Sequence, residues 1–195
     1  MHNYQYKLLI IIYLLLLGYT LERSIFAFKV PCKTKPNQKR WLTAIPFTTY
    51  IFFFIISVIE FSNKNAPFLN PLITSIGCFT VMLGITLRYQ AIITFKKNNQ
   101  DWFAHIEAKK INSIIIDGPY KYIRHPYYIS VIAELSGIAL SLNSFMSLFL
   151  ILTIQGSLLR MRILEEEKKL LNHFGDEYVT YISKVGSFFP KRRLK

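Results

Sequence analysis

Acidic residues are scarce in this chain, because 11 Asp and Glu stand against 24 Lys and Arg and leave a formal net charge of +13. Cysteine is scarcer still. Cys32 lies in a basic stretch and Cys78 inside an apolar run, so the two are not expected to meet and no disulfide framework is predicted. The four histidines make no metal-ligand spacing with Cys, Asp or Glu. We therefore expect no disulfide-stabilised module and no bound metal.

Several nucleotide-binding and hydrolytic motifs are missing as well. The chain has no Walker loop and no G-x-G-x-x-G, so a soluble-type nucleotide-binding fold is not indicated. It also has no serine-centred nucleophile elbow, which argues against a hydrolase of that kind. With 195 residues and no internal repeat, the length favours one domain.

Long uncharged runs are what the sequence has instead. Hydrophobic residues make up 52% of the chain, and they gather in the runs 8–21, 42–59, 66–87 and 135–159. A helix needs roughly 20 mostly apolar residues to cross a bilayer core. The last run is extended by the apolar segment 127–133, which makes it too long for one span. The polar "SLNS" at 141–144 is the turn that divides it.

These runs predict an all-α, polytopic integral membrane protein with about five transmembrane helices and a cytosolic C-terminal helical extension. The helices are expected at about 7–28, 41–61, 68–92, 126–141 and 145–164. Residues 1–65 form an N-terminal region with the first two helices, and residues 66–195 form a region with the other three, a cytosolic loop and the tail. A cleaved signal peptide is the alternative for the first segment, but no small-x-small cleavage site follows it.

The basic residues predict the orientation of these helices. The loop 29–40, the segment 88–124 and the tail from residue 160 are rich in Lys and Arg, whereas the alternate connections are nearly neutral. Because basic loops stay on the cytoplasmic side, five spans place the N-terminus outside. The positive charge then follows from topology and an anionic inner leaflet, so no nucleic-acid partner is expected.

The first candidate site is "DGPYKYIRHPYYIS" at residues 117–130. Pro126 suits the first turn of a helix, so Arg124 and His125 are expected at its mouth. A helix N-terminus suits a carboxylate or phosphate, and these two side chains reinforce it. The Gly118–Pro119 pair predicts a tight turn. The alternative interpretation is a belt of tyrosines at the membrane interface.

The second candidate site lies in "RMRILEEEKKLL", where the fifth span continues into the cytosol. Three consecutive glutamates fan around a helix and cannot share one face. Arg162 and Glu166 are i,i+4 neighbours, which is compatible with a plain surface salt bridge or with a site that binds ribose hydroxyls, an ammonium or an acidic group. Inside the spans, Glu22 and Arg23 suggest a snorkelling pair, and Glu134 is a candidate to face a cavity.

Together the two clusters resemble the isoprenylcysteine carboxyl methyltransferase family of integral membrane enzymes. The resemblance covers roughly residues 72–190 and includes G-x-Y-x-x-x-R-H-P-x-Y, the R-x-x-x-E-E run and "FGDEYVTYISKVGSFFP". It departs from the family where Ser130 replaces Gly and Asn112 replaces His. The resemblance implies methyl transfer from S-adenosylmethionine, at the cytosolic membrane face, to a lipid or lipid-linked acceptor that enters from the bilayer.

The resemblance also implies roles for individual residues. The cofactor-binding residues would be Asn112, Ser113, Ile114 and Ile115 of a strand-like segment, Tyr120, Arg124, His125, Pro126, Tyr127, Tyr128 and Glu166. The catalytic residues would be Arg162, Glu166 and Glu167, with Arg162 binding the acceptor carboxylate.

The expected reaction is carboxyl O-methylation of an isoprenylcysteine-like acceptor, which needs alignment and no general base because the sulfonium methyl is already electrophilic. Three alternatives stay open. The first is a phospholipid (ethanolamine-type) N-methyltransferase, in which Glu166 or Glu167 takes a proton. The second is an NADPH-dependent sterol-type membrane reductase. The third is a membrane protein that keeps the scaffold without catalysis.

Overall fold

The computed structural model of the chain describes residues 41–63, 69–98 and 113–191, without the side chains of residues 41–47. The expected first span at 7–28 and the basic loop at 29–40 lie outside the described residues. The chain divides into two compact units, Met1–Ile51 and Phe52–Lys195. Every contact discussed below lies within the second unit.

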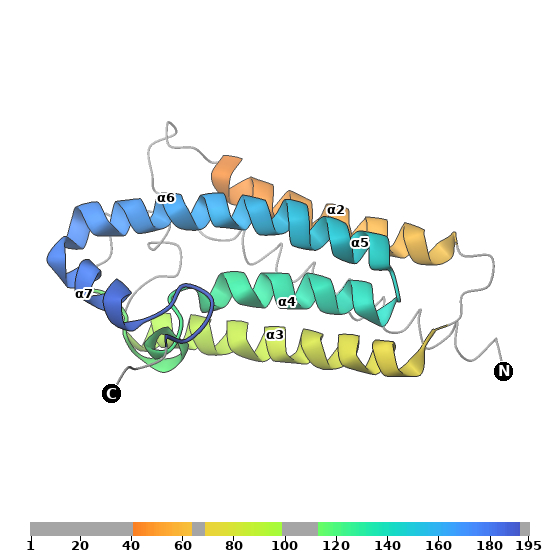
Figure 1. Cartoon of the computed structure of the whole chain (residues 1–195), viewed down its shortest axis with the longest axis horizontal. Helices are drawn as coiled ribbons and strands as arrows, with labels where there is room; N and C mark the ends of the chain where they lie inside the picture. Colours follow the sequence, from red (N-terminus) through yellow and green to blue (C-terminus); the bar gives the residue numbers. More distant parts are fainter. Residues whose placement is uncertain (1–40, 64–68, 99–112, 192–195) are drawn as a thin grey trace. The chain divides into compact units, whose positions relative to one another are not determined.

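The described residues are helical, and they contain no strand beyond one isolated bridge between Ile123 and Gly186. This agrees with the all-α prediction. The elements are α2 (Trp41–Ser62), α3 (Pro71–Lys97), the 3₁₀ turn η3 (Gly118–Lys121), α4 (Pro126–Ser141), α5 (Phe145–Leu150), the π-helical segment η4 (Ile151–Gln155), α6 (Gly156–Phe174) and α7 (Asp176–Lys184). The segments α5, η4 and α6 run on as one long helix (Figure 1).

Four of the five predicted helices can be compared with the structure. The predicted helix 126–141 has the bounds of α4, and the predicted 41–61 ends one residue before α2 does. The third helix begins at Pro71, because the Asn70 side chain accepts the backbone N–H of Leu72 and of Ile73 and caps it there. The helix predicted at 145–164 extends to Phe174. An apolar run indicates only the part of a helix that can lie in the membrane, and the helix continues beyond that part.

Among the described residues, two helices, Pro71–Lys97 and Phe145–Phe174, are long and apolar enough to cross a membrane by length and composition. Their outer faces carry large apolar side chains. On α3 alone, Leu72, Phe79 and Met82 are all more than half exposed. Such surfaces suit contact with lipid and are consistent with a membrane protein.

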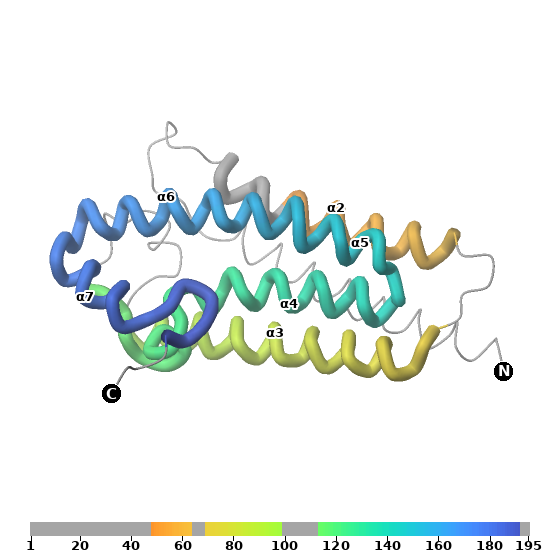
Figure 2. Tube along the Cα trace, in the orientation of Figure 1, coloured from red at the N-terminus to blue at the C-terminus, as the bar shows by residue number. Residues whose placement is uncertain are grey.

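Helices α3 and α4 pack against each other over their length, as Figure 2 shows. Glycines make the close approach possible. A Cβ on Gly137 would lie 2.7 Å from Val81 Cγ2, and one on Gly84 would lie 2.7 Å from Glu134 Cγ. Small residues at a helix contact are the usual means by which helices associate in a membrane. The α3–α4 pair is therefore a closely fitted unit that carries the candidate site at one end.

A buried ion pair joins the same two helices. Arg88 Nη2 lies 2.5 Å from Glu134 Oε1, and the two side chains are only 4% and 1% exposed. Glu134 thus faces α3 and Arg88, where the sequence had made it a candidate to face a cavity. Arg88 was not predicted as the partner of Glu134. It directly follows the uncharged run 66–87 and was therefore counted with the basic segment 88–124.

The turn predicted at 141–144 is confirmed. Asn143 there adopts a positive φ of 53°. Its side chain accepts the backbone N–H of Asn70 at 3.2 Å and donates to Thr74 Oγ1 at 3.0 Å. From α2, the Glu60 carboxylate accepts the backbone N–H of Ser147 at 2.8 Å and so caps α5. Side chains of α2 and α3, together with Asn143 itself, thus fix the turn at the other end of α4 from the candidate site.

Candidate active site

The N-terminus of α4, called the α4 mouth below, begins at Pro126 as predicted from the sequence. Pro126 occupies the first turn, and His125 precedes it as the N-cap residue with φ −124°. The backbone N–H groups of Arg124 and His125 donate to the carbonyls of Gly186 at 2.9 Å and Ser187 at 3.3 Å. The segment after α7 therefore returns to the start of α4, an arrangement visible in Figure 2.

The Gly118–Pro119 turn places the Tyr120 side chain in the interior, against α3. Gly118 adopts a φ of 53°, which a residue with a Cβ rarely does, and a Cβ there would also collide with Thr94 Oγ1. Tyr120 is buried, and its ring meets that of Phe95 edge to face with centroids 5.2 Å apart. Burial raises the pKa of its hydroxyl well above 10.0, so the ring stays neutral.

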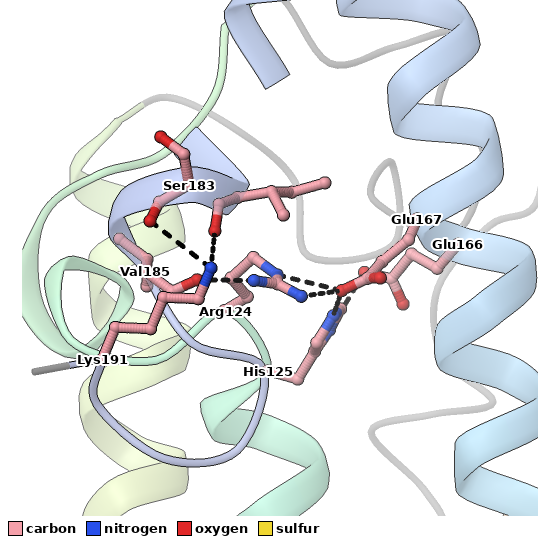
Figure 3. A network of polar contacts seen from close by, with 8 residues as sticks. Arg124, His125, Glu166, Glu167, Ser183, Val185 and Lys191 are labelled. Carbon is pink, nitrogen blue, oxygen red and sulfur yellow. Dashed lines mark hydrogen bonds and ion pairs between the residues drawn. The ribbon is translucent and has the colours of Figure 1, made fainter. Parts of the chain in front are cut away.

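Glu167 holds the two cationic or potentially cationic residues of the α4 mouth. Its Oε1 lies 2.9 Å from Arg124 Nε, 2.8 Å from Arg124 Nη2 and 3.0 Å from His125 Nε2 (Figure 3). Burial opposes ionisation of this carboxyl, but the hydrogen bonds from His125 and Arg124 outweigh burial and lower its pKa below 4.5. Arg124 also donates through Nη1 to the Val185 carbonyl, which ties the tail to α6.

Glu166 faces a different partner from its neighbour. Tyr128 Oη donates to Glu166 Oε2 at 2.6 Å, and Arg162 Nε donates to the same Tyr128 oxygen at 2.9 Å. His125 Nδ1 lies 4.0 Å from Glu166 Oε1, which brings the two glutamates and the histidine into one cluster. The two sequence motifs, far apart in the chain, thus meet side chain to side chain.

A pocket opens beside this cluster. It is lined by Phe95, Ser113, Ile114, Ile115, Tyr120, Arg124, His125, Leu170, Tyr178 and Tyr181. The Tyr178 hydroxyl is buried without a hydrogen-bond partner among the described residues, and burial, the largest cause, raises its pKa. Tyr181 donates to the Tyr120 carbonyl at 2.8 Å and closes one wall.

The predicted site residues divide between the pocket and the cluster. Six of them line the pocket: Ser113, Ile114, Ile115, Tyr120, Arg124 and His125. Tyr128, Arg162, Glu166 and Glu167 form the polar cluster, and the Tyr127 ring lies against that of Tyr128 with centroids 6.0 Å apart. Asn112 lies outside the described residues. The strand-like description of 112–115 was wrong for its described part, because residues 114–116 have no pairing partner and form no strand.

Four pocket residues were missed from the sequence: Phe95, Leu170, Tyr178 and Tyr181. Phe95 lies in the last turns of α3, beyond the predicted end of that helix at residue 92, and was therefore assigned to a loop. Tyr178 and Tyr181 are three residues apart on α7 and share a face that is buried with Leu170 and Val185. That spacing in "FGDEYVTYISKV" was the available signal.

The described residues contain no group of three or more His, Cys, Asp and Glu that could hold a metal ion. What they contain is a set of apolar helices suited to a membrane, with a polar cluster and an aromatic-lined pocket at one end. This combination is consistent with a membrane protein that has a small-molecule site. The sequence model of the isoprenylcysteine carboxyl methyltransferase (ICMT) family matches residues 75–172, and the chain belongs to this family.

Two yeast relatives have names that agree with the family, and a third relative has a different name. The protein-S-isoprenylcysteine O-methyltransferase of Schizosaccharomyces pombe is 30% identical over 139 residues, which cover 70% of this chain and 57% of that protein. The enzyme of the same name from Saccharomyces cerevisiae is 33% identical over 62% of this chain and 50% of its own length. The cobalt-zinc-cadmium resistance protein CzcN of Cupriavidus metallidurans is 23% identical over 72% of this chain and 61% of its own.

The chain therefore spans between half and about three fifths of the length of these relatives. No solved structure matches it. The predicted resemblance to the family is confirmed over residues 75–172, and the family implies a methyl donor.

Proposed function

We propose that the chain is an S-adenosylmethionine-dependent methyltransferase of the membrane, which methylates the carboxylate of an isoprenylcysteine-like lipidic acceptor. One observation carries the proposal: the R-H-P-x-Y and R-x-x-x-E-E motifs meet in three dimensions through Tyr128, Arg162 and Glu166. Membership of the family and the names of the yeast relatives support the same chemistry.

The lining of the pocket supports this choice of cofactor. Its aromatic and aliphatic walls suit a flat heterocycle, and the buried Tyr178 hydroxyl lacks a partner within the described part of the chain, as a group that binds a polar ligand would. Segment 113–116 forms no strand, so its backbone groups are not committed to a sheet. We assign cofactor binding to Asn112, Ser113, Ile114, Ile115, Tyr120, Arg124, His125, Pro126, Tyr127, Tyr128 and Glu166. When bound, S-adenosylmethionine supplies an electrophilic methyl group.

The residues of the cluster then have distinct tasks. Arg162 binds the acceptor carboxylate, for which its planar fork is suited. An ionised carboxylate needs no general base, so the protein contributes alignment and the exclusion of water. Glu166 holds polar groups of the cofactor. Glu167 fixes Arg124 and His125, and the buried aromatic walls keep water from the reacting groups.

The proposed topology has five spans, with the N-terminus outside and the site on the cytosolic face. The basic loops of the sequence support this orientation, as does the position of the cluster near the charged end of α6, which we assign to a cytosolic extension. Residues 66–195 form the catalytic region, and residues 1–65 supply the first two spans. The acceptor enters from the bilayer, since its lipid part has no reason to leave it.

The test is an incubation of the full-length chain in lipid nanodiscs with radiolabelled S-adenosylmethionine. S-farnesylcysteine and phosphatidylethanolamine serve as two separate acceptors. We expect base-labile label on the farnesylcysteine, as a methyl ester gives. Base-stable label on the phosphatidylethanolamine would point to amine methylation instead. Binding of NADPH without binding of S-adenosylmethionine would overturn the proposal.

A further inference from the structure

The Tyr128 hydroxyl occupies a position between the two charged side chains of the proposed reaction. It donates its proton to Glu166 Oε2 at 2.6 Å and accepts Arg162 Nε–H at 2.9 Å. The Arg162 guanidinium carbon also lies 5.9 Å from the centroid of the Tyr128 ring. Tyr128 is only 8% exposed, and its ring is held by Tyr127 and His125, with centroids 6.0 and 5.7 Å away.

The direction of these hydrogen bonds limits what each group does. A phenol has one proton, and here it goes to the carboxylate, so the oxygen meets Arg162 only as an acceptor. The bond reaches Arg162 at Nε, on the stem side of the guanidinium, and therefore fixes the plane of the fork. A guanidinium with a fixed plane is already oriented for a bidentate carboxylate.

Helix geometry supplies a competing arrangement. Arg162 and Glu166 are i,i+4 neighbours on α6, a spacing at which opposite charges can pair directly along the helix surface. A direct pair would join the group proposed to bind the acceptor to the group proposed to bind the cofactor. The buried ring of Tyr128 places an oxygen between them.

We propose that Tyr128 is a positioning residue that acts through Arg162 and Glu166: its hydroxyl keeps the two apart and orients each toward its own ligand. This role rests on the proposed methyl transfer. It is separate from the cofactor contact assigned to Tyr128 above, and it acts through the two hydrogen bonds of the hydroxyl. It predicts that removal of one oxygen atom lets Arg162 and Glu166 pair with each other.

The first experiment compares Tyr128→Phe with Tyr122→Phe, a control at a side chain that is 59% exposed and outside the site. The probe for the cofactor site is S-adenosylhomocysteine, which cannot react, measured by calorimetry on the full chain. We expect Tyr128→Phe to weaken its binding about tenfold, the fold-change of a hydrogen bond to a charged group. The kcat with farnesylcysteine falls and the acceptor KM rises, while the thermal midpoint stays near wild type because the ring remains.

A second substitution separates positioning from packing. Arg162→Met in the Tyr128→Phe background removes the partner that captures Glu166, so we expect S-adenosylhomocysteine affinity to recover to within a few-fold of wild type. Turnover is not restored, since the acceptor-binding guanidinium is gone. A packing role for Tyr128 gives no such recovery, because the second substitution only removes another contact.

The outcomes are distinct. If the wild-type chain transfers methyl groups and Tyr128→Phe binds and turns over normally, the positioning role is wrong and the proposed function stands. The role is also wrong if the double variant binds no better than Tyr128→Phe. A wild-type chain that neither binds S-adenosylhomocysteine nor transfers a methyl group overturns the proposed function, and the role of Tyr128 with it.

Discussion

At the scale of single residues, two adjacent glutamates on α6 have different surroundings. Glu166 accepts from Tyr128, and Glu167 accepts from Arg124 and His125. Consecutive positions on a helix differ by about 100°, so neighbours necessarily face different elements. The proposed division of labour, with Glu166 on the cofactor and Glu167 on the α4 mouth, follows from this geometry.

Glu167 makes the stability of the chain depend on pH. Its pKa in the folded chain is lowered from 4.5, so its stabilising contribution is present above about pH 4.5 and is lost as the pH falls through the folded value. Glu167→Gln should therefore lower the free energy of unfolding by about 1.5 to 3 kcal/mol near pH 7, the range for hydrogen bonds to a charged group.

The measurement is the thermal midpoint in detergent from pH 7 down to pH 3.5. The difference between wild type and Glu167→Gln should shrink below pH 4.5, because the wild-type carboxyl becomes protonated there. Glu165→Gln is the control, since Glu165 is exposed on the same helix. A difference that does not change with pH would mean that the charge of Glu167 does not stabilise the fold.

Three residues distinguish the proposed cofactor site from the proposed acceptor site. We expect Glu166→Ala and His125→Ala to abolish S-adenosylhomocysteine binding without unfolding the chain, and Arg162→Ala to keep that affinity and lose turnover. The reason is that Glu166 and His125 lie together beside the pocket, whereas Arg162 reaches the cluster through Tyr128. Calorimetry and thermal unfolding on the same preparations measure both effects. Normal binding in the first two variants would assign these residues to structure alone.

At the scale of elements, the buried Arg88–Glu134 pair joins α3 to α4 on the way to the site. Breaking such a pair leaves an uncompensated buried charge, whereas replacing both partners by apolar residues is often neutral. We expect Glu134→Leu to destabilise the chain by about 3 to 5 kcal/mol. The double variant Arg88→Met with Glu134→Leu should recover most of this loss.

Thermal unfolding of the two variants in the same detergent measures the effect, with Tyr89→Leu as the control on the exposed face of α3. Methyl transfer by the double variant is a second readout, because the pair holds the helices and touches no ligand in the proposed mechanism. If the double variant were less stable than Glu134→Leu alone, the two charges would be stabilised by separate partners.

Sequence reasoning was accurate for elements whose bounds are set by neighbouring residues. The bounds of α4 follow from Pro126 at its start and from the "SLNS" turn at its end. The return of the segment 185–187 to the α4 mouth was not predictable, because it depends on backbone hydrogen bonds that no side chain encodes. The partner of Glu134 was missed for a related reason: a buried pair depends on the register between two helices, which a single sequence does not give.

The same distinction applies to the candidate site. The two motifs identified the residues of the cluster, since carboxylates are unusual in a helix segment beside a membrane face that favours cations. The order of their contacts was not predictable. Arg162 and Glu166 meet through Tyr128, and the pocket wall includes Tyr178 and Tyr181, whose contribution depends on how α7 folds back.

At the scale of the whole molecule, an odd number of spans places the two ends of the chain on opposite sides of the membrane. The proposal of five spans therefore makes a prediction that is independent of catalysis. The test uses two single-cysteine variants, His2→Cys and Lys195→Cys, each in a background with Cys32→Ser and Cys78→Ser. The two variants should differ in their reaction with a membrane-impermeant maleimide added to intact cells. His2→Cys should react, and Lys195→Cys should react only after permeabilisation.

The physical reason is the cost of moving basic segments across the bilayer. The loop 29–40 and the tail from residue 160 are both rich in Lys and Arg, and both are retained on the cytoplasmic side in this arrangement. Native Cys32, tested alone in a Cys78→Ser chain, should then behave like Lys195→Cys, because loop and tail share a side. If both ends react in intact cells, the number of spans is even and the tail faces outside, which overturns the cytosolic position of the site. If neither end reacts before permeabilisation, the number of spans is even because the first apolar segment does not cross, and the site keeps its cytosolic position.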